Sequence, residues 1–310
     1  MYPRPPRWSA IGRPDPCRPA TLRAVAVQPV FIGDVQGCAD EFEELLVRLR
    51  QELGAGVELW LVGDLVNRGP ANLRLLERVH DLVEAGRARY VLGNHEIALL
   101  QTALGRRPLR EGDSFGDVLH SPDLSYWVEW LRRRPLLETG RLGRRRFALV
   151  HAAVHPDWDL ETLEKRARRV EERLGAAELE SAEELLGAER DRDPDRDLLD
   201  RLTCCRSVGP REGWSKDEPA GSSEPWHRAW AARGHDYAVV YGHWAMQGLH
   251  VAPGLRGLDT GCVHHGRGRA GRLTAWIPDV GASDPFAVPD DRFRQVGARR
   301  VYRPADAEGG

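Results

Sequence analysis

The chain reads QPVFIGDVQG over residues 28–37 and VELWLVGDLVNRG over residues 57–69. In both stretches an apolar run ends in Gly-Asp, which is the pattern of a buried strand that enters a tight loop. Apolar residues then recur at helical spacing, from Phe42 to Leu53 and from Leu75 to Val83, and Tyr90 to Leu92 starts a third apolar run. Strand, loop and helix in succession predict an α/β fold with a parallel sheet, whose sites lie at the carboxyl ends of strands.

The composition is that of an ordinary soluble globular protein. Of the 310 residues 41% are hydrophobic, and 45 basic against 47 acidic residues leave a formal charge of −2, so there is no overall positive field of the kind that a general nucleic-acid-binding protein carries. The five cysteines form no Cys-x-x-Cys pair, and we expect reduced thiols. No apolar run approaches the roughly 18 residues of a membrane span, and the first twenty residues lack the apolar core of a signal peptide. We therefore expect a cytoplasmic protein.

The domain organisation follows from breaks in these patterns. Residues 1–24 are rich in proline and arginine and predict a disordered tail, residues 25–283 predict a single domain, and residues 284–310 lose periodicity and predict a loosely ordered tail. Within the domain, the dense charges of residues 176–200 predict a solvated helix with a flexible end, and the glycine, proline and serine of residues 209–225 predict a loop.

Five short polar motifs each follow an apolar run. They are Gly33-Asp34-Val35-Gln36-Gly37, Gly63-Asp64-Leu65-Val66-Asn67-Arg68-Gly69, Gly93-Asn94-His95-Glu96, His151-Ala152 and Gly242-His243-Trp244. One Gly-Asp alone is common in turns, but the five together offer carboxylates, an amide and imidazoles, which are the ligands that Mn²⁺ and similar ions take. Two such ions roughly 3.5–4 Å apart can clamp a phosphoryl group and activate a water.

At these motifs the chain resembles the calcineurin-like metallophosphoesterases, and within them the phosphoprotein phosphatase group. The resemblance implies a central β-sandwich flanked by helices. It also implies two divalent metal ions, expected to be Mn²⁺ or Co²⁺, whose ligands would be Asp34, Gln36, Asp64, Asn94, His151 and His243.

The same resemblance gives the site residues separate roles. Asp34 is expected at the first metal, Asp64 would bridge the two metals, and Asn94, His151 and His243 would complete the second metal. His95 matches the position of the proton donor, and Arg68 that of a phosphate-gripping arginine.

A narrower resemblance is to the symmetrical bis(5'-nucleosyl)-tetraphosphatase branch. It rests on residues 130–137, 151–160 and 215–216, Gly242-His243-Trp244-Ala245 and Leu258-Asp259-Thr260-Gly261-Cys262. The branch implies metal-dependent hydrolysis of dinucleoside polyphosphates, diadenosine tetraphosphate to two ADP, by in-line attack of a metal-bridging hydroxide. It also implies RNA ends capped by a nucleoside tetraphosphate as a further substrate.

Three positions depart from the family pattern or match it loosely. Gln36 stands where the superfamily usually has a histidine ligand, and a neutral amide binds metal more weakly. Asn67 stands where protein phosphatases have an aspartate that steadies the proton-donor histidine. Arg206 would be a second phosphate clamp, so that Asn67, Arg68 and Arg206 are the expected substrate-binding residues.

Two other functions compete with this interpretation. A serine/threonine protein phosphatase is disfavoured by Asn67, because an alkoxide is a poor leaving group that needs a well-oriented acid. A non-catalytic metal-binding module is suggested by Gln36 alone, and the other motif residues argue against it. For Asp259 the sequence leaves open either support of a ligand histidine or a simple turn, and for Glu96 it suggests capping of the following helix.

Overall fold

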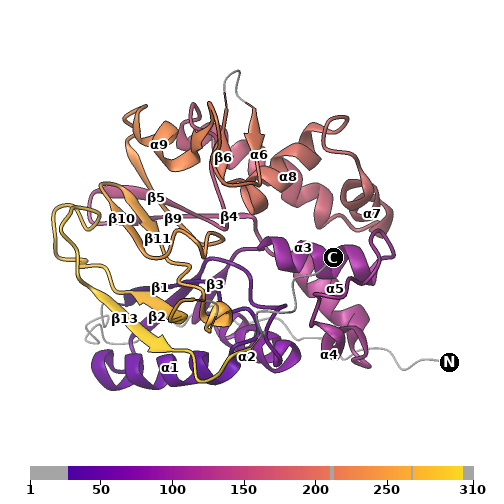
Figure 1. The fold of residues 1–310 in the computed structure, drawn as a ribbon, viewed down its shortest axis with the longest axis horizontal. Coiled ribbons are helices and arrows are strands. Elements are labelled where there is room, and N and C mark those ends of the chain that lie inside the picture. Colours follow the sequence, from indigo (N-terminus) through magenta and orange to yellow (C-terminus); the bar gives the residue numbers. More distant parts are fainter. Residues whose placement is uncertain (1–26, 210–212, 267, 303–310) are drawn as a thin grey trace, which may run out of the picture.

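The computed structural model describes residues 27–209, 213–266 and 268–302, so the predicted tail over residues 1–24 lies outside the described residues. Two five-stranded sheets pack face to face and helices cover their outer faces (Figure 1). The architecture is mixed α/β, as predicted, with the sandwich and flanking helices that the resemblance implied.

The first sheet has the order β13-β12-β1-β2-β3. Its parallel part is β1 (Gln28–Ile32), β2 (Val57–Leu61) and β3 (Ala88–Tyr90), which are the three strands predicted from the sequence. β12 (Arg272–Trp276) adds antiparallel to β1, and β13 (Phe293–Gly297) adds antiparallel to β12. The expected loose tail from residue 284 onward is therefore wrong for β13, which is too short an edge strand to show a clear period.

The second sheet has the order β10-β11-β9-β5-β4. β5 (Arg145–Val150), β9 (Tyr237–Tyr241) and β11 (Leu255–Gly257) run parallel, and the antiparallel strands β4 (Leu137–Leu142) and β10 (His250–Ala252) close the two edges. Each sheet thus places the carboxyl ends of three parallel strands together.

Successive side chains of β1 point alternately to the two faces of the first sheet, as the two-residue period of a strand requires. Val30 and Ile32 belong to the core that includes α1 (Ala39–Leu53) and α2 (Asn72–Glu84), whereas Phe31 faces the second sheet. There the ring of Phe147 lies 5.3 Å from that of Phe31 and 5.2 Å from that of Trp60. These aromatic contacts fix how the two sheets stack.

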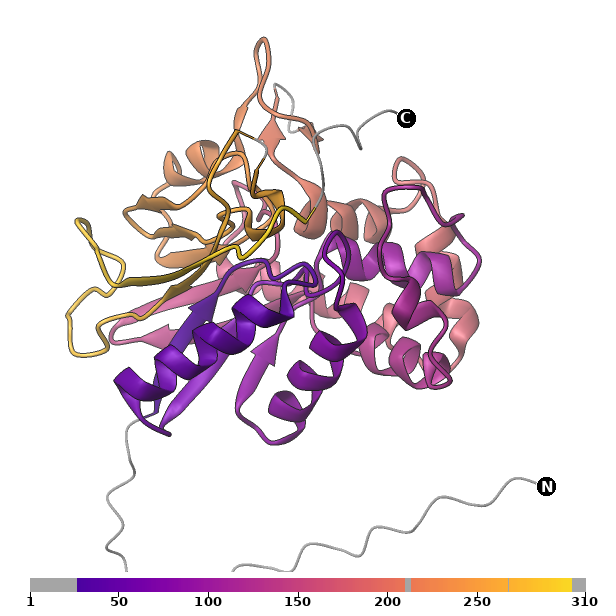
Figure 2. The ribbon, with the colours of Figure 1, turned by 60° about the horizontal axis from the view of Figure 1, so that its bottom comes forward.

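Further helices gather at one side of the sandwich, as Figure 2 shows. They are α3 (Asn94–Ala103), α4 (Gly116–Leu119), α5 (Leu124–Arg132), α6 (Leu160–Leu174), α7 (Leu179–Gly187) and α8 (Pro194–Cys204). α7 buries Leu185 and Leu186, and α8 buries Leu198 and Leu199. The expected solvated helix with a flexible end over residues 176–200 is therefore wrong: the charges lie on the outer sides of two packed helices.

Between β5 and β9 the chain adds a small three-stranded sheet. It consists of β6 (Ser207–Val208), β7 (Trp214–Ser215) and β8 (Glu224–Pro225), and is followed by α9 (Trp226–Ala231); a short 3-10 helix, η2 (Cys262–His264), comes later. The stretch expected as a loop thus carries two short strands. Among the described residues no helix is both long and apolar enough to cross a membrane.

Candidate functional site

The five motifs meet at one edge of the sandwich. Asp34 follows β1, Asp64 follows β2, and Asn94 opens α3 after β3, while His151 and His243 follow β5 and β9 of the other sheet. Because these strands are parallel within each sheet, their carboxyl ends bring side chains from both sheets together.

Asn94 joins the two histidines. Its Oδ1 lies 3.0 Å from Nε2 of His151 and 2.9 Å from Nδ1 of His243. The other nitrogen of each ring faces a backbone carbonyl, of Val62 and of Cys204 respectively, each at 2.9 Å. A carbonyl oxygen only accepts, so each neutral ring donates its single N–H there and turns a lone pair toward Asn94.

Both rings are neutral in this environment. Burial lowers the pKa of His151 to about 4, and burial followed by the charge of Arg206 lowers that of His243 well below its ordinary value. An amide oxygen and two imidazole lone pairs therefore converge without a proton between them. Such a set of acceptors, with both rings anchored through their outer N–H, fits a bound cation.

Three buried carboxylates lie beside these acceptors. Burial, then the charges of Asp259 and Asp64, raise the pKa of Asp34 well above its ordinary value, and burial raises that of Asp64 to about 7. Burial also raises the pKa of Asp259. Carboxylate oxygens of Asp34 and Asp64 and a ring nitrogen of His151 all lie within 4.8 Å of one another. Positive charge at this point would let the carboxylates ionise together.

Two motif glycines make room for these carboxylates. A Cβ added to Gly93 would lie 2.2 Å from Oδ1 of Asp64, and one added to Gly242 would lie 2.0 Å from Oδ1 of Asp34. Both distances are far inside van der Waals contact. The glycines that precede Asn94 and His243 are therefore required by the carboxylates that pack against them.

The amide of Asn67 is oriented by its neighbours. Its Oδ1 accepts from the backbone N–H of Arg68 (2.8 Å) and of Ser114 (2.9 Å), so its Nδ2 is the group that lies 3.0 Å from Nδ1 of His95. Nδ2 also donates to Oδ1 of Asp113, at 3.0 Å. His95 Nδ1 therefore accepts, and the ring proton sits on Nε2, 3.7 Å from Oδ2 of Asp64.

Glu96 ties two of the loops together. Its fully buried carboxylate accepts from the backbone N–H of Gly93, Asp64, Leu65 and Val66, at 2.8–3.1 Å. It thus caps α3, as the sequence suggested, and also holds the loop that presents Asp64.

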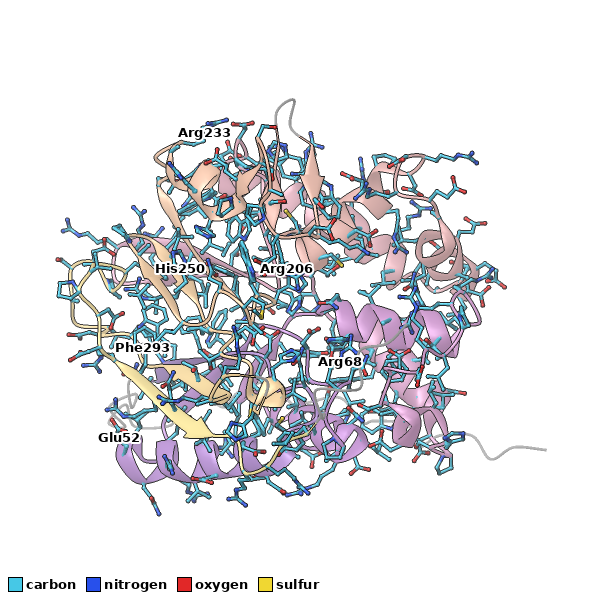
Figure 3. The ribbon with its side chains drawn as sticks, in the orientation of Figure 1. Glu52, Arg68, Arg206, Arg233, His250 and Phe293 are labelled. Carbon is cyan, nitrogen blue, oxygen red and sulfur yellow. The ribbon has the colours of Figure 1, made fainter. Side chains whose placement is uncertain are left out.

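Two arginines reach the site from opposite halves, and Figure 3 shows Arg68 and Arg206 near the middle of the molecule. Nη1 of Arg68 donates to Gly112 O at 3.1 Å, and Nη2 of Arg206 donates to His243 O at 3.4 Å. Both line a cleft of about 560 Å³ that also contains Asp64, Asn94 and His95.

Gln36 lies among the same groups, and its Nε2 donates to Oδ2 of Asp64 at 3.3 Å. Gln36 also belongs to a set of strained residues. The non-glycine residues with positive φ in the described chain are Gln36 (47°), Asp64 (49°), Asn67 (76°), Arg68 (68°) and His243 (67°). All five lie in the motifs, and left-handed backbone at non-glycine residues concentrates at functional sites.

The structure thus brings every predicted site residue to one edge, and it adds two. Asp113 could not be found from the sequence, because it belongs to no motif and reaches Asn67 from a loop 46 residues away. Asp259 had a signal, since it follows β11 as the other motifs follow their strands. It is buried and lines the cleft, and its Oδ1 accepts from Gly261 N as in a turn.

Residues 29–270 match the sequence profile of the calcineurin-like phosphoesterases, and the chain belongs to this family. It is accordingly a hydrolase, and membership implies divalent metal ions.

Curated relatives narrow the comparison. A Ralstonia nicotianae protein named "Bis(5'-nucleosyl)-tetraphosphatase, symmetrical" is 36% identical over 270 residues, which cover 82% of this chain and 92% of the relative. A Nitrosococcus oceani protein of the same name is 37% identical over 263 residues, 78% of this chain and 91% of the relative. The crystal structure of a proposed diadenosine tetraphosphatase has a TM-score of 0.57 at 22% identity, covers 89% of this chain and 96% of its own, and shows the fold alone.

Proposed function

We propose that this chain hydrolyses dinucleoside tetraphosphates symmetrically, converting diadenosine tetraphosphate into two ADP. The observation that carries the proposal is the convergence of Asn94 Oδ1 with the lone pairs of His151 and His243, next to Asp34 and Asp64. The names of the relatives at 36% and 37% identity supply the substrate.

In this proposal two divalent cations bind, with Mn²⁺ or Co²⁺ preferred because oxygen and imidazole donors are mixed. Asp34 and Gln36 would hold the first, Asp64 would bridge, and Asn94, His151 and His243 would hold the second. When bound, the cations polarise the phosphoryl oxygens and lower the pKa of a water.

The remaining residues act on the substrate directly. Arg68 and Arg206 hold the charged phosphoryl oxygens from two sides, which is the larger part of catalysis in phosphoryl transfer. His95 presents Nε2–H to the departing oxygen, and the Asn67 amide keeps that proton in place.

The leaving group distinguishes this proposal from a serine/threonine phosphatase. A neutral imidazole donates a hydrogen bond but is a weak acid, and ADP can depart as a stabilised phosphate with little protonation. A serine alkoxide needs a full proton. The Asn67 contact to His95 thus favours an anhydride substrate.

Product analysis tests the proposal. Purified enzyme with Mn²⁺ and diadenosine tetraphosphate should give ADP alone, quantified by anion-exchange chromatography. ATP together with AMP would show asymmetric attack, and a higher kcat/KM for a phosphoserine peptide would assign the chain to protein dephosphorylation. An Asp64→Asn variant in the same assay controls for contaminating hydrolases.

A further inference from the structure

The candidate site lies at the junction of two clefts. Besides the cleft of about 560 Å³, a second one of about 460 Å³ extends along α3 and α8. The two share Arg68, Asn94, His95 and Lys216, so a chain-like substrate held at the junction would extend into both.

The two clefts differ in charge. The second is lined by six cations and two carboxylates (Asp113 and Asp200), which leaves a formal +4. The first is lined by four cations and four carboxylates, which leaves no formal charge apart from histidine. The cations of the second cleft are Arg68, Arg107, Arg110, Arg190, Arg196 and Lys216. Away from the shared junction, where the metal cations would bind, the second cleft therefore attracts an anionic chain more strongly than the first.

Part of this positive charge is fixed in place. Arg107 pairs with Asp113 at 2.8 Å, and Arg196 pairs with Asp200 at 3.0 Å. The Nε of Arg196 is buried and finds no hydrogen-bond partner among the described residues. The two ion pairs hold the guanidinium groups of Arg107 and Arg196 at fixed places on the wall of the cleft.

Two further arginines are open to solvent. Arg110 is exposed, and Arg190, whose side chain is 43% exposed, lies over the ring of Trp214 at 4.7 Å. Trp214 is itself held by a hydrogen bond from Nε1 to Asp197 at 2.8 Å. With Arg190 over this ring, the cleft presents guanidinium groups, which suit phosphate.

We propose that this second cleft, the arginine arm, binds the phosphate chain of the leaving half of the substrate and selects leaving groups with two or more phosphates. The assignment to the leaving half follows from His95, which stands at the mouth of the arm and faces the departing oxygen. The inference rests on the proposed function. Beyond that function, it states that the arginine arm recognises the charge of the phosphates and not the nucleoside of the leaving half.

The test uses the double variant Arg110→Gln/Arg190→Gln, which removes the two exposed charges. It breaks the exposed pair of Arg190 with Asp191 (3.5 Å) and leaves the pairs of Arg107 and Arg196 intact. Arg141→Gln is the matched control, because Arg141 is an exposed arginine on β4 near the hairpin at the far end of the sandwich. The ratio of kcat/KM for diadenosine tetraphosphate to that for p-nitrophenyl phosphate should fall about tenfold in the double variant, since exposed charge pairs each contribute a few-fold. Arg141→Gln should leave the ratio unchanged. An equal loss on both substrates, or an unchanged ratio, would overturn the assignment.

Calorimetry separates this inference from the proposed function. The Kd for ADP should rise about tenfold in the double variant while the Kd for orthophosphate stays constant, both with Mn²⁺ in excess. If the wild type fails to cleave the dinucleotide but the Kd for ADP still rises in the double variant, the proposed function is wrong and the arginine arm stands. If it cleaves the dinucleotide and the ADP affinity is unchanged, the arm is wrong and the proposed function stands.

Discussion

The amide nitrogen of Asn67 lies 3.0 Å from Nδ1 of His95 and 3.0 Å from Oδ1 of Asp113. A carboxylate in place of this amide would accept a hydrogen bond from a protonated Nδ1 and favour the imidazolium form. The amide instead donates, so the ring is held neutral, and burial together with the charge of Arg68 lowers the His95 pKa well below its ordinary value. The contact between Asn67 and His95 therefore predicts that a change at residue 67 alters the preference of the site between phosphoanhydrides and phosphoesters.

Asn67→Asp should improve hydrolysis of alkyl phosphoesters relative to anhydrides. The new carboxylate can still accept from the backbone of Arg68 and Ser114 while it raises the pKa of His95. We expect the kcat/KM ratio of a phosphoserine peptide to diadenosine tetraphosphate to rise about tenfold, less than the roughly hundredfold or more of a complete general-acid effect. Because Asp113 would repel the new charge, Asn67→Asp/Asp113→Asn should show a larger rise, and Asp113→Asn alone should show none. An unchanged ratio in both carboxylate variants would mean that His95 does not protonate the leaving group.

Chelation should abolish turnover. EDTA removes the cations that the buried carboxylates need, and activity should return with Mn²⁺ or Co²⁺ better than with Mg²⁺, which prefers oxygen ligands alone. Initial rates after dialysis and metal addition measure this order. Full activity in EDTA would contradict a metal-dependent site. Asp64→Asn should remove nearly all activity at every metal concentration, because Asp64 would serve both cations.

Metal binding should release protons in a pH-dependent way. The Asp64 pKa is raised to about 7, so in the metal-free protein this carboxyl is largely protonated at pH 6 and ionised at pH 8. His151, with its pKa lowered to about 4, is neutral at both values and releases nothing. At Asp64 a cation must therefore displace a proton at pH 6 but not at pH 8, so more protons should be released at pH 6 and the apparent affinity should rise with pH across this range. Calorimetry in buffers of different ionisation enthalpy counts the protons; equal release at the two pH values would show that Asp64 is ionised before metal binds.

Gly242→Ala should disable the site. The added methyl would stand 2.0 Å from Oδ1 of Asp34 and 2.6 Å from Cγ2 of Val62, so the carboxylate or the β9 loop must move. We expect a loss of unfolding free energy of about 1–3 kcal/mol, typical of overpacking, and Mn²⁺ affinity lowered about tenfold or more. Gly297→Ala is the control, because its Cβ would meet nothing within 4 Å. Denaturant unfolding and calorimetric Mn²⁺ titration separate the two effects, and wild-type values for Gly242→Ala would refute the packing argument.

The sequence predicted the parallel strands and the site for one physical reason. Strand periodicity is local, and every ligand in the motifs stands directly after such a strand, so finding the strand also locates the ligand. The apolar runs that begin at Gln28 and at Val57 form β1 and β2 for the same reason. Their burial needs no knowledge of distant partners.

What could not be predicted depends on contacts between distant segments. β13 forms because it pairs with β12. The helices α7 and α8 are packed and not solvated on all sides because they contact α3 and α6. Asp113 matters only through Asn67. The overall charge of the chain did not indicate the arginine arm, since Arg107 and Arg190 line the same cleft only after folding.

The five left-handed residues of the motifs have a consequence for engineering. Each such conformation costs a non-glycine residue about 1–2 kcal/mol, which glycine would avoid. Arg68→Gly, at a half-buried position with φ 68°, should therefore raise the melting temperature while it slows turnover. A selection for heat resistance alone would favour glycine at these positions, so thermostabilised variants of this enzyme should be screened for catalysis at every round.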